Sequence, residues 1–269
     1  MWSSAALALL LSCTPAQAGK LEVTNVRATH GVLGAPRTDA KILPGDILHL
    51  AFDIGGLQSD AQGRMRFGVT IELFDAKDKS VFKQDLGEVD QVNVFGAGRT
   101  RYAVRVATGV DKPEPGTYRL KVIVTDVFAK RETSFTHPFT ILPPDFGLVR
   151  FQLTYDPWAQ VPAPPAGVVG QILYVNAVAV GMRRDPKNDN QSALFVEMTV
   201  LDEQNKPTLA KPLTGNFTNI PGDVTALPFR FDLPIQRAGR YTLVLTATDQ
   251  LSKKKVTLHI PLTVTDPIK

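Results

Sequence analysis

The chain of 269 residues carries 21% charged and 43% hydrophobic residues, a balance that favours globular packing over disorder and allows one large domain or two ordinary ones. Its formal net charge is only +4, and the basic and acidic residues are interspersed. Neither nucleic acid nor an anionic membrane surface is therefore an expected partner. The basic run Lys253–Lys255 lies where a hairpin turn is expected.

Residues 1–18 have the pattern of a signal peptide. Ala5–Leu11 is a short apolar run, and Ala16–Ala18 supplies the small residues that signal peptidase requires. The run is too short to span a bilayer, so we expect export, cleavage after Ala18 and no transmembrane span. No Lys or Arg precedes the run, which is unusual for an export signal. The expected location is secreted or periplasmic.

The cysteine content qualifies this picture. Leu10–Cys13 resembles a bacterial lipobox, in which Cys13 would become a lipidated N-terminus, so a lipid anchor at the cell envelope is the alternative. Cleavage after Ala18 is favoured because the leader would be very short for a lipoprotein. Cys13 is the only cysteine, so that cleavage leaves no disulfide and the fold must depend on its hydrophobic cores. This favours a bacterial envelope protein.

The sequence contains an internal repeat, which indicates that one module was duplicated. Three blocks recur in the same order and with nearly the same offset: PGDILHLAFDIGGL, ending at Leu57, recurs as VGQILYVNAVAVGM, ending at Met182; VTIELFDAKDK (69–79) recurs as VEMTVLDEQNK (196–206); and GTYRLKVIVTD (116–126) recurs as GRYTLVLTATD (239–249).

The repeated blocks alternate apolar and other residues with a period of two, which is typical of half-buried strands. In chain order, the first copy has expected strands at Leu21–Val26, Leu48–Ile54, Phe67–Leu73, a short one near Val81, Tyr102–Val106, Tyr118–Val124 and Phe135–Ile141. The second copy has them at Val149–Tyr155, Leu173–Ala179, Leu194–Val200, Phe229–Leu233, Tyr241–Ala247 and Leu258–Val264. No segment of useful length shows a helical period.

We therefore expect an all-β fold of two tandem β-sandwich modules with about seven strands each. The modules are residues 19–142 and 146–269, behind the signal segment 1–18. The linker 143–145 is short and stiffened by two prolines, so the modules should hold a restricted relative orientation.

Two pairs of matching residues are interpreted as structural. Tyr118 and Tyr241 each follow Gly-x at the start of the same strand, where a tyrosine hydroxyl bonds back to nearby backbone and fixes a corner. Pro138 and Pro261 fall at matching places inside the last strand, and since proline donates no ladder hydrogen bond this strand is an edge or is bulged there. His137, opposite Ile260 of the second copy, is expected to be a core histidine with its hydrogen bonds satisfied.

The chain resembles the bacterial immunoglobulin-like and fibronectin-type β-sandwich modules of envelope proteins. The resemblance rests on the Gly-x-Tyr motif, the alternating strand that follows it and the aspartate at the end of that strand, Asp126 or Asp249. The resemblance covers nearly all of the mature chain at superfamily level. It implies a spacer, an adhesion unit or a partner-binding surface, and the fold alone does not decide among these.

Candidate ligand contacts lie in the loops. Trp158, in the loop Pro157–Pro165, would stack on a sugar ring or anchor a protein partner if exposed, although a tryptophan that covers the open end of a sandwich is the favoured interpretation. Asp185 and Asp189 lie in the segment DPKNDN, whose oxygens suit calcium, but the segment lacks the spacing of a recognised calcium loop and a plain turn is favoured.

No catalytic constellation is recognisable. An acidic loop with Asp85, Glu88 and Asp90 would suit glycoside chemistry, but the second copy has no such pair and a solvated loop is favoured. The histidines are scattered without metal-ligand spacing, and no cysteine nucleophile survives export. We expect a non-enzymatic envelope protein without a cofactor, acting as a spacer or binding a protein or cell-wall glycan. The alternative is an exported protease inhibitor or a hydrolase-associated accessory protein.

Overall fold

The structure, a computed structural model, describes residues 19–94, 99–108 and 114–268, and within these ranges every regular element is a strand. The fold is therefore all-β, as the alternating pattern predicts. The described residues contain no helix long and apolar enough to cross a membrane. Cys13 and Ala18, the candidate lipidation and cleavage positions, lie outside the described residues.

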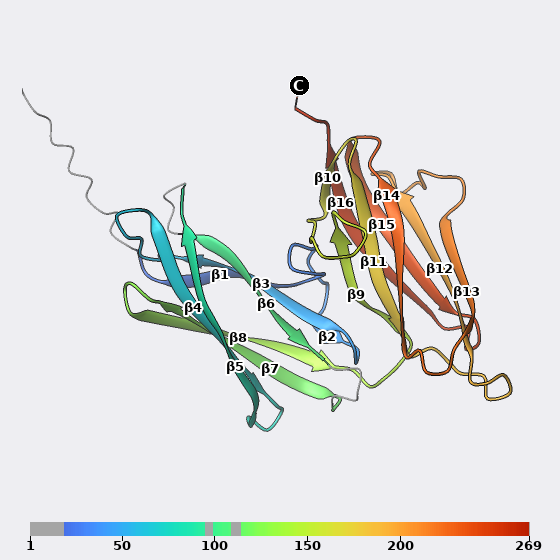
Figure 1. Ribbon diagram of the computed structural model, residues 1–269, viewed down its shortest axis with the longest axis horizontal. Helices are drawn as coiled ribbons and strands as arrows, with labels where there is room; N and C mark the ends of the chain where they lie inside the picture. The colour runs from blue at the N-terminus through green and yellow to red at the C-terminus, as the bar shows by residue number, and fades with distance from the viewer. Residues whose placement is uncertain (1–18, 95–98, 109–113, 269) are drawn as a thin grey trace, which may run out of the picture.

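The first half of the chain forms two sheets that face each other (Figure 1). One has the strand order β1-β3-β6 and the other the order β2-β8-β7-β4-β5. The strands are β1 (Glu22–Thr29), β2 (Lys41–Ile42), β3 (Ile47–Gly55), β4 (Arg64–Phe74), β5 (Ser80–Val92), β6 (Thr100–Ala107), β7 (Gly116–Asp126) and β8 (Arg131–Ile141).

The second half repeats this arrangement strand for strand, with the orders β9-β11-β14 and β10-β16-β15-β12-β13. In both halves the short second strand runs parallel to the last one, whereas the other pairs are antiparallel. The strands are β9 (Gly147–Thr154), β10 (Ala166–Val168), β11 (Ile172–Val180), β12 (Ser192–Leu201), β13 (Leu213–Ile220), β14 (Ala226–Pro234), β15 (Gly239–Asp249) and β16 (Lys255–Thr265).

The register of the strands shows that the repeat in the sequence is a repeat in the fold. Leu50 lies opposite Val104 in the first half, and their counterparts Val175 and Phe231 lie opposite each other in the second. Because side chains alternate between the two faces of a strand, equal register places equivalent residues in the core. Each half accordingly has its own cluster of buried apolar side chains between its two sheets.

The two corner tyrosines make equivalent hydrogen bonds. The Tyr118 hydroxyl donates to the carbonyl of Glu114 (2.9 Å), and the Tyr241 hydroxyl donates to the carbonyl of Arg237 (3.1 Å). In both halves the acceptor is the fourth residue before the tyrosine. Each bond fixes the turn that leads into β7 or β15.

Asp126 and Asp249 link the two sheets within each half. Asp126 is fully buried, and one of its carboxylate oxygens accepts a hydrogen bond from the backbone N–H of Gln58 (3.0 Å), just beyond β3. Asp249 accepts the equivalent bond from the N–H of Arg183 (2.9 Å) and a further bond from the Ser252 hydroxyl (2.6 Å). A buried carboxylate is stable only when such donors replace its water. These bonds therefore position the hairpin ends against the opposite sheet.

Pro138 and Pro261 lie on free edges rather than at bulges. Both strands keep an unbroken register with their antiparallel neighbours, β7 and β15. The parallel partners β2 and β10 pair only with later residues of β8 and β16, beginning at Thr140 and Thr263. At the two prolines, therefore, β8 and β16 have only one neighbouring strand, and β2 and β10 pair with them only further along.

Three expectations from the sequence are wrong in detail. The short strand near Val81 is the long strand β5, so the expected acidic loop is part of a ladder with β4. Among the described residues each half has eight strands rather than about seven, because β2 and β10 are too short to show an alternating pattern. His137 is half-buried, and its Nε2 atom is buried without a hydrogen-bond partner, so this histidine is not satisfied.

Candidate functional site

Trp158 lies on the loop between β9 and β10 and is 76% exposed. The interpretation that it covers the open end of a sandwich is therefore wrong. Exposing the apolar surface of a large aromatic side chain to water is unfavourable in free energy. Exposed aromatic side chains are typical anchors in protein interfaces. We therefore take this loop as the starting point of the candidate site.

A single carboxylate holds the Trp158 loop in shape. The two oxygens of Asp156 accept hydrogen bonds from the backbone N–H groups of Trp158 (2.9 Å), Gln160 (3.0 Å) and Val161 (2.5 Å). Desolvation alone would raise the pKa of Asp156, but the bonds from Val161, Gln160 and Trp158 outweigh it and lower this pKa. The loop is thus preorganised, and binding through it does not require ordering of the backbone.

The first half has a loop of the same construction between β1 and β2. The Thr29 hydroxyl donates to the carbonyl of Gly31 (2.7 Å), as the Thr154 hydroxyl donates to the carbonyl of Asp156 (2.8 Å). The sequence offset that aligns Thr29 with Thr154 also aligns Leu33 with Trp158. Leu33 is 48% exposed, so both halves display an apolar side chain at the same loop position.

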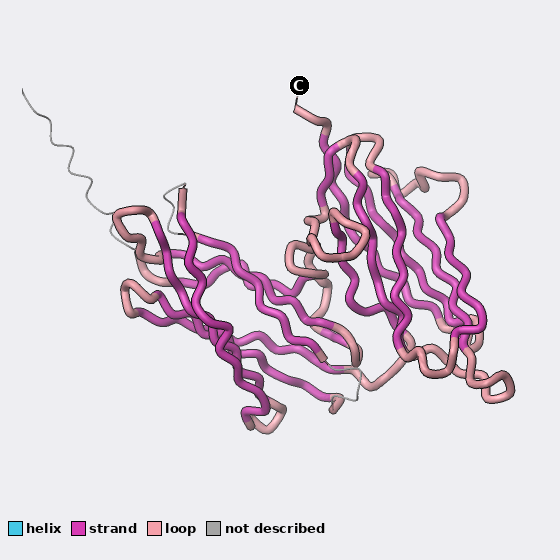
Figure 2. The backbone as a smooth tube through the Cα atoms, in the orientation of Figure 1, coloured by secondary structure: helices cyan, strands magenta, loops and turns pink. Residues whose placement is uncertain are grey.

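The two loops lie next to each other across the junction between the halves, as Figure 1 and Figure 2 show. Gln152 of β9 connects them, because its side-chain amide donates to the carbonyl of Ala159 (3.3 Å) while its Cβ lies 3.2 Å from the position where a Cβ on Gly31 would be. We call the exposed apolar side chains of the two loops the loop-tip surface: Val32, Leu33, Tyr155, Trp158 and Val161.

The junction below this surface is held by direct contacts. Ala35, from the first half, is 1% exposed and belongs to the core cluster of the second half. Arg150 of β9 donates its backbone N–H to the Asp46 carboxylate (2.9 Å) and its Nε–H to the carbonyl of Gly45 (2.7 Å). These contacts fix the two loops relative to each other.

A cavity of about 120 Å³ lies in the junction and is lined in part by His30 and His49. Burial, with the positive charge of Arg37 adding to it, lowers the pKa of His30 to about 4. Burial also lowers the pKa of His49, whose Nδ1 atom is buried without a hydrogen-bond partner. Both rings are therefore neutral at pH 7. The carboxylate in the lining, Asp46, is paired with Arg37 at 2.9 Å, so it is not free to act as a base.

Asp185 and Asp189 lie in a tight turn before β12. The backbone closes the turn through the Asp185 N–H and the carbonyl of Gln191 (2.9 Å), and one Asp185 oxygen accepts from the N–H of Lys187 (3.0 Å). Asp189 has a positive φ of 46°, as residues in such turns often do. Within the described ranges, no three His, Cys, Asp or Glu side chains are grouped as a metal site requires.

The acidic residues of β5 make ion pairs along the sheet surface. Asp90 pairs with Arg64, and Glu88 pairs with Arg66 at 2.5 Å, all of them exposed side chains. These carboxylates do not face each other across a cleft, as glycoside hydrolysis requires.

The candidate site is therefore the loop-tip surface, of which the sequence indicates only Trp158. The repeat offset is the signal that relates Leu33 to it.

Comparison with known proteins does not assign the chain to a family. No family model matches the chain, and no curated protein matches it. Among solved structures, the alkylpurine DNA glycosylase AlkC of Pseudomonas fluorescens, bound to DNA with an abasic-site analogue, matches 46% of this chain and 30% of that chain, at 13% identity and a TM-score of 0.31. A red sea bream transglutaminase matches 92% of this chain and 31% of that chain, at 9% identity and a TM-score of 0.27. This chain thus matches less than a third of either protein, and similarity this weak supports no functional argument.

Proposed function

We propose that this chain is an exported, non-enzymatic envelope protein that binds a protein partner through the loop-tip surface. It consists of two tandem immunoglobulin-like modules, residues 19–142 and 146–269, behind a signal segment cleaved after Ala18. The paired sheets, the equal strand order and the corner tyrosines in both halves support the immunoglobulin-like assignment.

The single observation that carries the binding proposal is the 76% exposure of Trp158 on a loop braced by Asp156. Interface hot spots are typically aromatic anchors at the centre of a patch whose rim excludes water. Leu33 and Val161, on the same two loops, add further exposed apolar area. Three of the five side chains of the loop-tip surface, Val32, Leu33 and Val161, are aliphatic and offer no hydrogen bonds to sugar hydroxyls, so a protein is favoured over a cell-wall glycan.

The proposal is tested by comparing the wild type and three variants of the full chain in pull-downs from envelope extract. Trp158→Ala and Leu33→Ala should each lose a protein that the wild type retains. Val94→Ala, at a side chain 77% exposed and outside the loop-tip surface, should retain it. Titration with the purified protein should then show binding weakened by roughly 30-fold in Trp158→Ala, the size of a hot-spot contribution.

Two results would contradict the proposal. Retention of the same protein by all three variants would place the interface elsewhere. Binding of the wild type to insoluble cell-wall glycan, lost in Trp158→Ala without any protein that depends on Trp158, would show that the surface recognises sugar. N-terminal mass spectrometry of the exported chain tests the processing step, which should leave Gly19 as the first residue.

A further inference from the structure

A second concave site lies at one end of the second half, apart from the loop-tip surface. It is a cavity of about 680 Å³ between the ends of β12, β13 and β14, and its floor includes the core residues Met198, Leu233 and Leu262. Small-molecule sites in proteins typically have volumes of roughly 300–1,000 Å³ and largely apolar walls. The size and lining of this cavity fit that class.

The cavity opens where the second half departs from the first. In the first half, the turn Asp75–Lys79 leads directly into β5, which pairs with the end of β4 with only a one-residue irregularity between Leu73 and Phe74. The second half keeps the same turn, with the Asp202 N–H bonded to the carbonyl of Lys206 (2.9 Å), but then inserts Leu209–Pro212 outside the ladder before β13 begins at Leu213. The ladder is therefore interrupted at the mouth of the cavity.

This interruption leaves apolar side chains at the mouth. Leu209 is 53% exposed and Leu213 is 37% exposed, and both line the cavity. Among the described residues, no buried side-chain atom that lacks a hydrogen-bond partner belongs to the cavity walls. Most of the lining residues are apolar, which suits a hydrocarbon chain.

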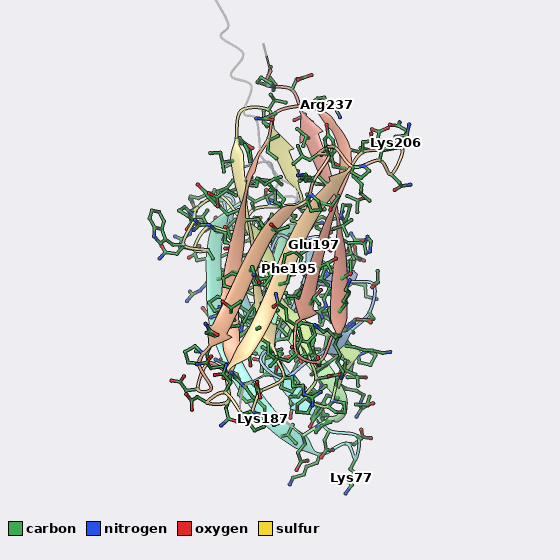
Figure 3. The ribbon with its side chains drawn as sticks, turned by 90° about the vertical axis from the view of Figure 1, so that its right-hand side faces the viewer. Lys77, Lys187, Phe195, Glu197, Lys206 and Arg237 are labelled. Atoms are coloured by element: carbon green, nitrogen blue, oxygen red, sulfur yellow. The ribbon has the colours of Figure 1, made fainter. Side chains whose placement is uncertain are left out.

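One exposed cationic side chain, Arg237, lies at the mouth. Arg237 donates its Nε–H to the Tyr241 hydroxyl (3.2 Å), and its two terminal nitrogens form no hydrogen bond or ion pair with other described residues. Asp232, the acidic residue of the lining, is paired with Arg230 at 2.9 Å. Figure 3 shows Arg237 at the same end of the sandwich as the loop of Lys206, with Lys187 at the opposite end.

We propose that this cavity binds the hydrocarbon chain of a long-chain carboxylate, with the carboxylate at Arg237. Each methylene removed from water contributes to binding, and a guanidinium recognises a carboxylate through two parallel hydrogen bonds. The Tyr241 hydroxyl holds the Arg237 side chain by Nε, which leaves the two terminal nitrogens for the ligand. The first half has Glu114 at the position of Arg237, so the equivalent corner there carries the opposite charge.

Calorimetric titration of the full chain with decanoate tests the proposal. Decanoate should bind, and each methylene removed on going to octanoate and hexanoate should weaken binding roughly fourfold. Arg237→Gln should weaken decanoate binding by about tenfold or more while leaving 1-decanol binding unchanged, because the alcohol carries no charge. The backbone carbonyl that Tyr241 uses is retained in this variant.

Four further variants separate this site from other surfaces. Leu213→Asp and Leu209→Asp place a charge at the mouth and should abolish binding of both ligands; Leu209 lies outside the ladder, so its variant folds even if the other does not. Glu114→Gln is the matched control and should bind as the wild type does. Trp158→Ala should also bind decanoate normally, which makes this proposal independent of the protein-binding one.

Three outcomes would overturn the proposal. The first is absence of decanoate binding at millimolar concentration. The second is equal binding by Leu209→Asp and the wild type, which would place the ligand elsewhere. The third is equal binding of decanoate by Arg237→Gln and the wild type, which would exclude the carboxylate contact.

Discussion

The carboxylate of Asp46 accepts a hydrogen bond from the backbone N–H of Arg150, and this bond joins the two halves of the chain. Arg150 occupies an irregularity in β9 with a positive φ of 51°. Asn25 is its counterpart in β1, with a φ of 52°, but there the side chain bonds to Asp53 within its own half. The irregularity in β1 therefore makes a hydrogen bond within the first half, whereas the equivalent irregularity in β9 makes one that joins the second half to the first.

Asp46→Ala should destabilise the protein strongly. The substitution removes the acceptor for the Arg150 N–H and leaves Arg37, whose side chain is only 14% exposed, without its partner. Loss of one member of a buried pair costs about 3 kcal/mol in the free energy of unfolding, measured by urea denaturation. Asp90→Ala, which breaks an exposed pair with Arg64, is the control and should leave the unfolding midpoint close to that of the wild type. Equal midpoints for both variants would show that the Asp46 contacts do not stabilise the junction.

Gly181→Ala should destabilise the second half by about 3 kcal/mol, because two penalties coincide. Gly181 has a φ of +67°, and a Cβ there would lie 2.1 Å from the carbonyl oxygen of Asp145. Gly87→Ala is the matched control, since Gly87 has a φ of +82° but nothing within 4 Å of its Cβ position. It should lose only about 1 kcal/mol, the cost of the left-handed backbone. Thermal unfolding of both variants measures the difference, and equal losses would contradict the steric explanation.

Tyr118→Phe and Tyr241→Phe should each lower the free energy of unfolding by about 1 kcal/mol, the net contribution of one hydrogen bond. Each variant keeps the ring in place and removes only the hydroxyl that donates to the fourth residue before it. Urea unfolding of the single variants and the double variant should give additive losses, because the two tyrosines lie in separate cores. An unchanged midpoint in both single variants would mean that the corner bonds are replaced by water without cost.

Stability should fall as the pH drops from about 6.5 to about 4, through the titration of His30. Its pKa is about 4 in the folded chain and about 6.5 when unfolded, so between these values the unfolded chain binds more protons and acid favours unfolding. The full effect is about 3 kcal/mol, and His49 and His137 shift in the same direction. His30→Phe keeps an aromatic ring against Phe151 and removes this titration, so its stability should depend less on pH between 6.5 and 4.5. Parallel pH profiles for the wild type and the variant would rule out His30 as the cause.

The sequence predicts most of the strands because their inward side chains are apolar and alternate, as in Leu48–Ile54 and its repeat. It predicts only a short strand near Val81 in place of the long β5, because the residues of this edge strand are nearly all exposed, so that polar residues such as Asp85 occupy both faces. It misses β2 and β10 because two or three residues cannot display a period. An alternating pattern reveals a strand only where one of its faces is buried and apolar. Exposed strands and strands of two or three residues bury too few side chains to show it.

The candidate site is less accessible to sequence reasoning, because exposure and proximity are tertiary properties. The identity of Trp158 is visible in the sequence, but only the braced loop shows that the side chain points into water. Leu33 joins it through the packing of Gly31 against Gln152, a contact between two halves of the chain. The cavity near Arg237 likewise arises from the interrupted ladder at Leu209–Pro212, which no local pattern predicts.

Pro138 and Pro261 bear on how the molecule behaves at high concentration. The N–H groups of Thr140 and Thr263 point toward the short parallel strand or its flanking residues, and two residues earlier each proline has its nitrogen on the same open side. A strand from another molecule that approached this edge would find no donor at that point. Each copy of the repeat therefore carries its own barrier against intermolecular sheet formation, which a chain with two such edges would otherwise invite.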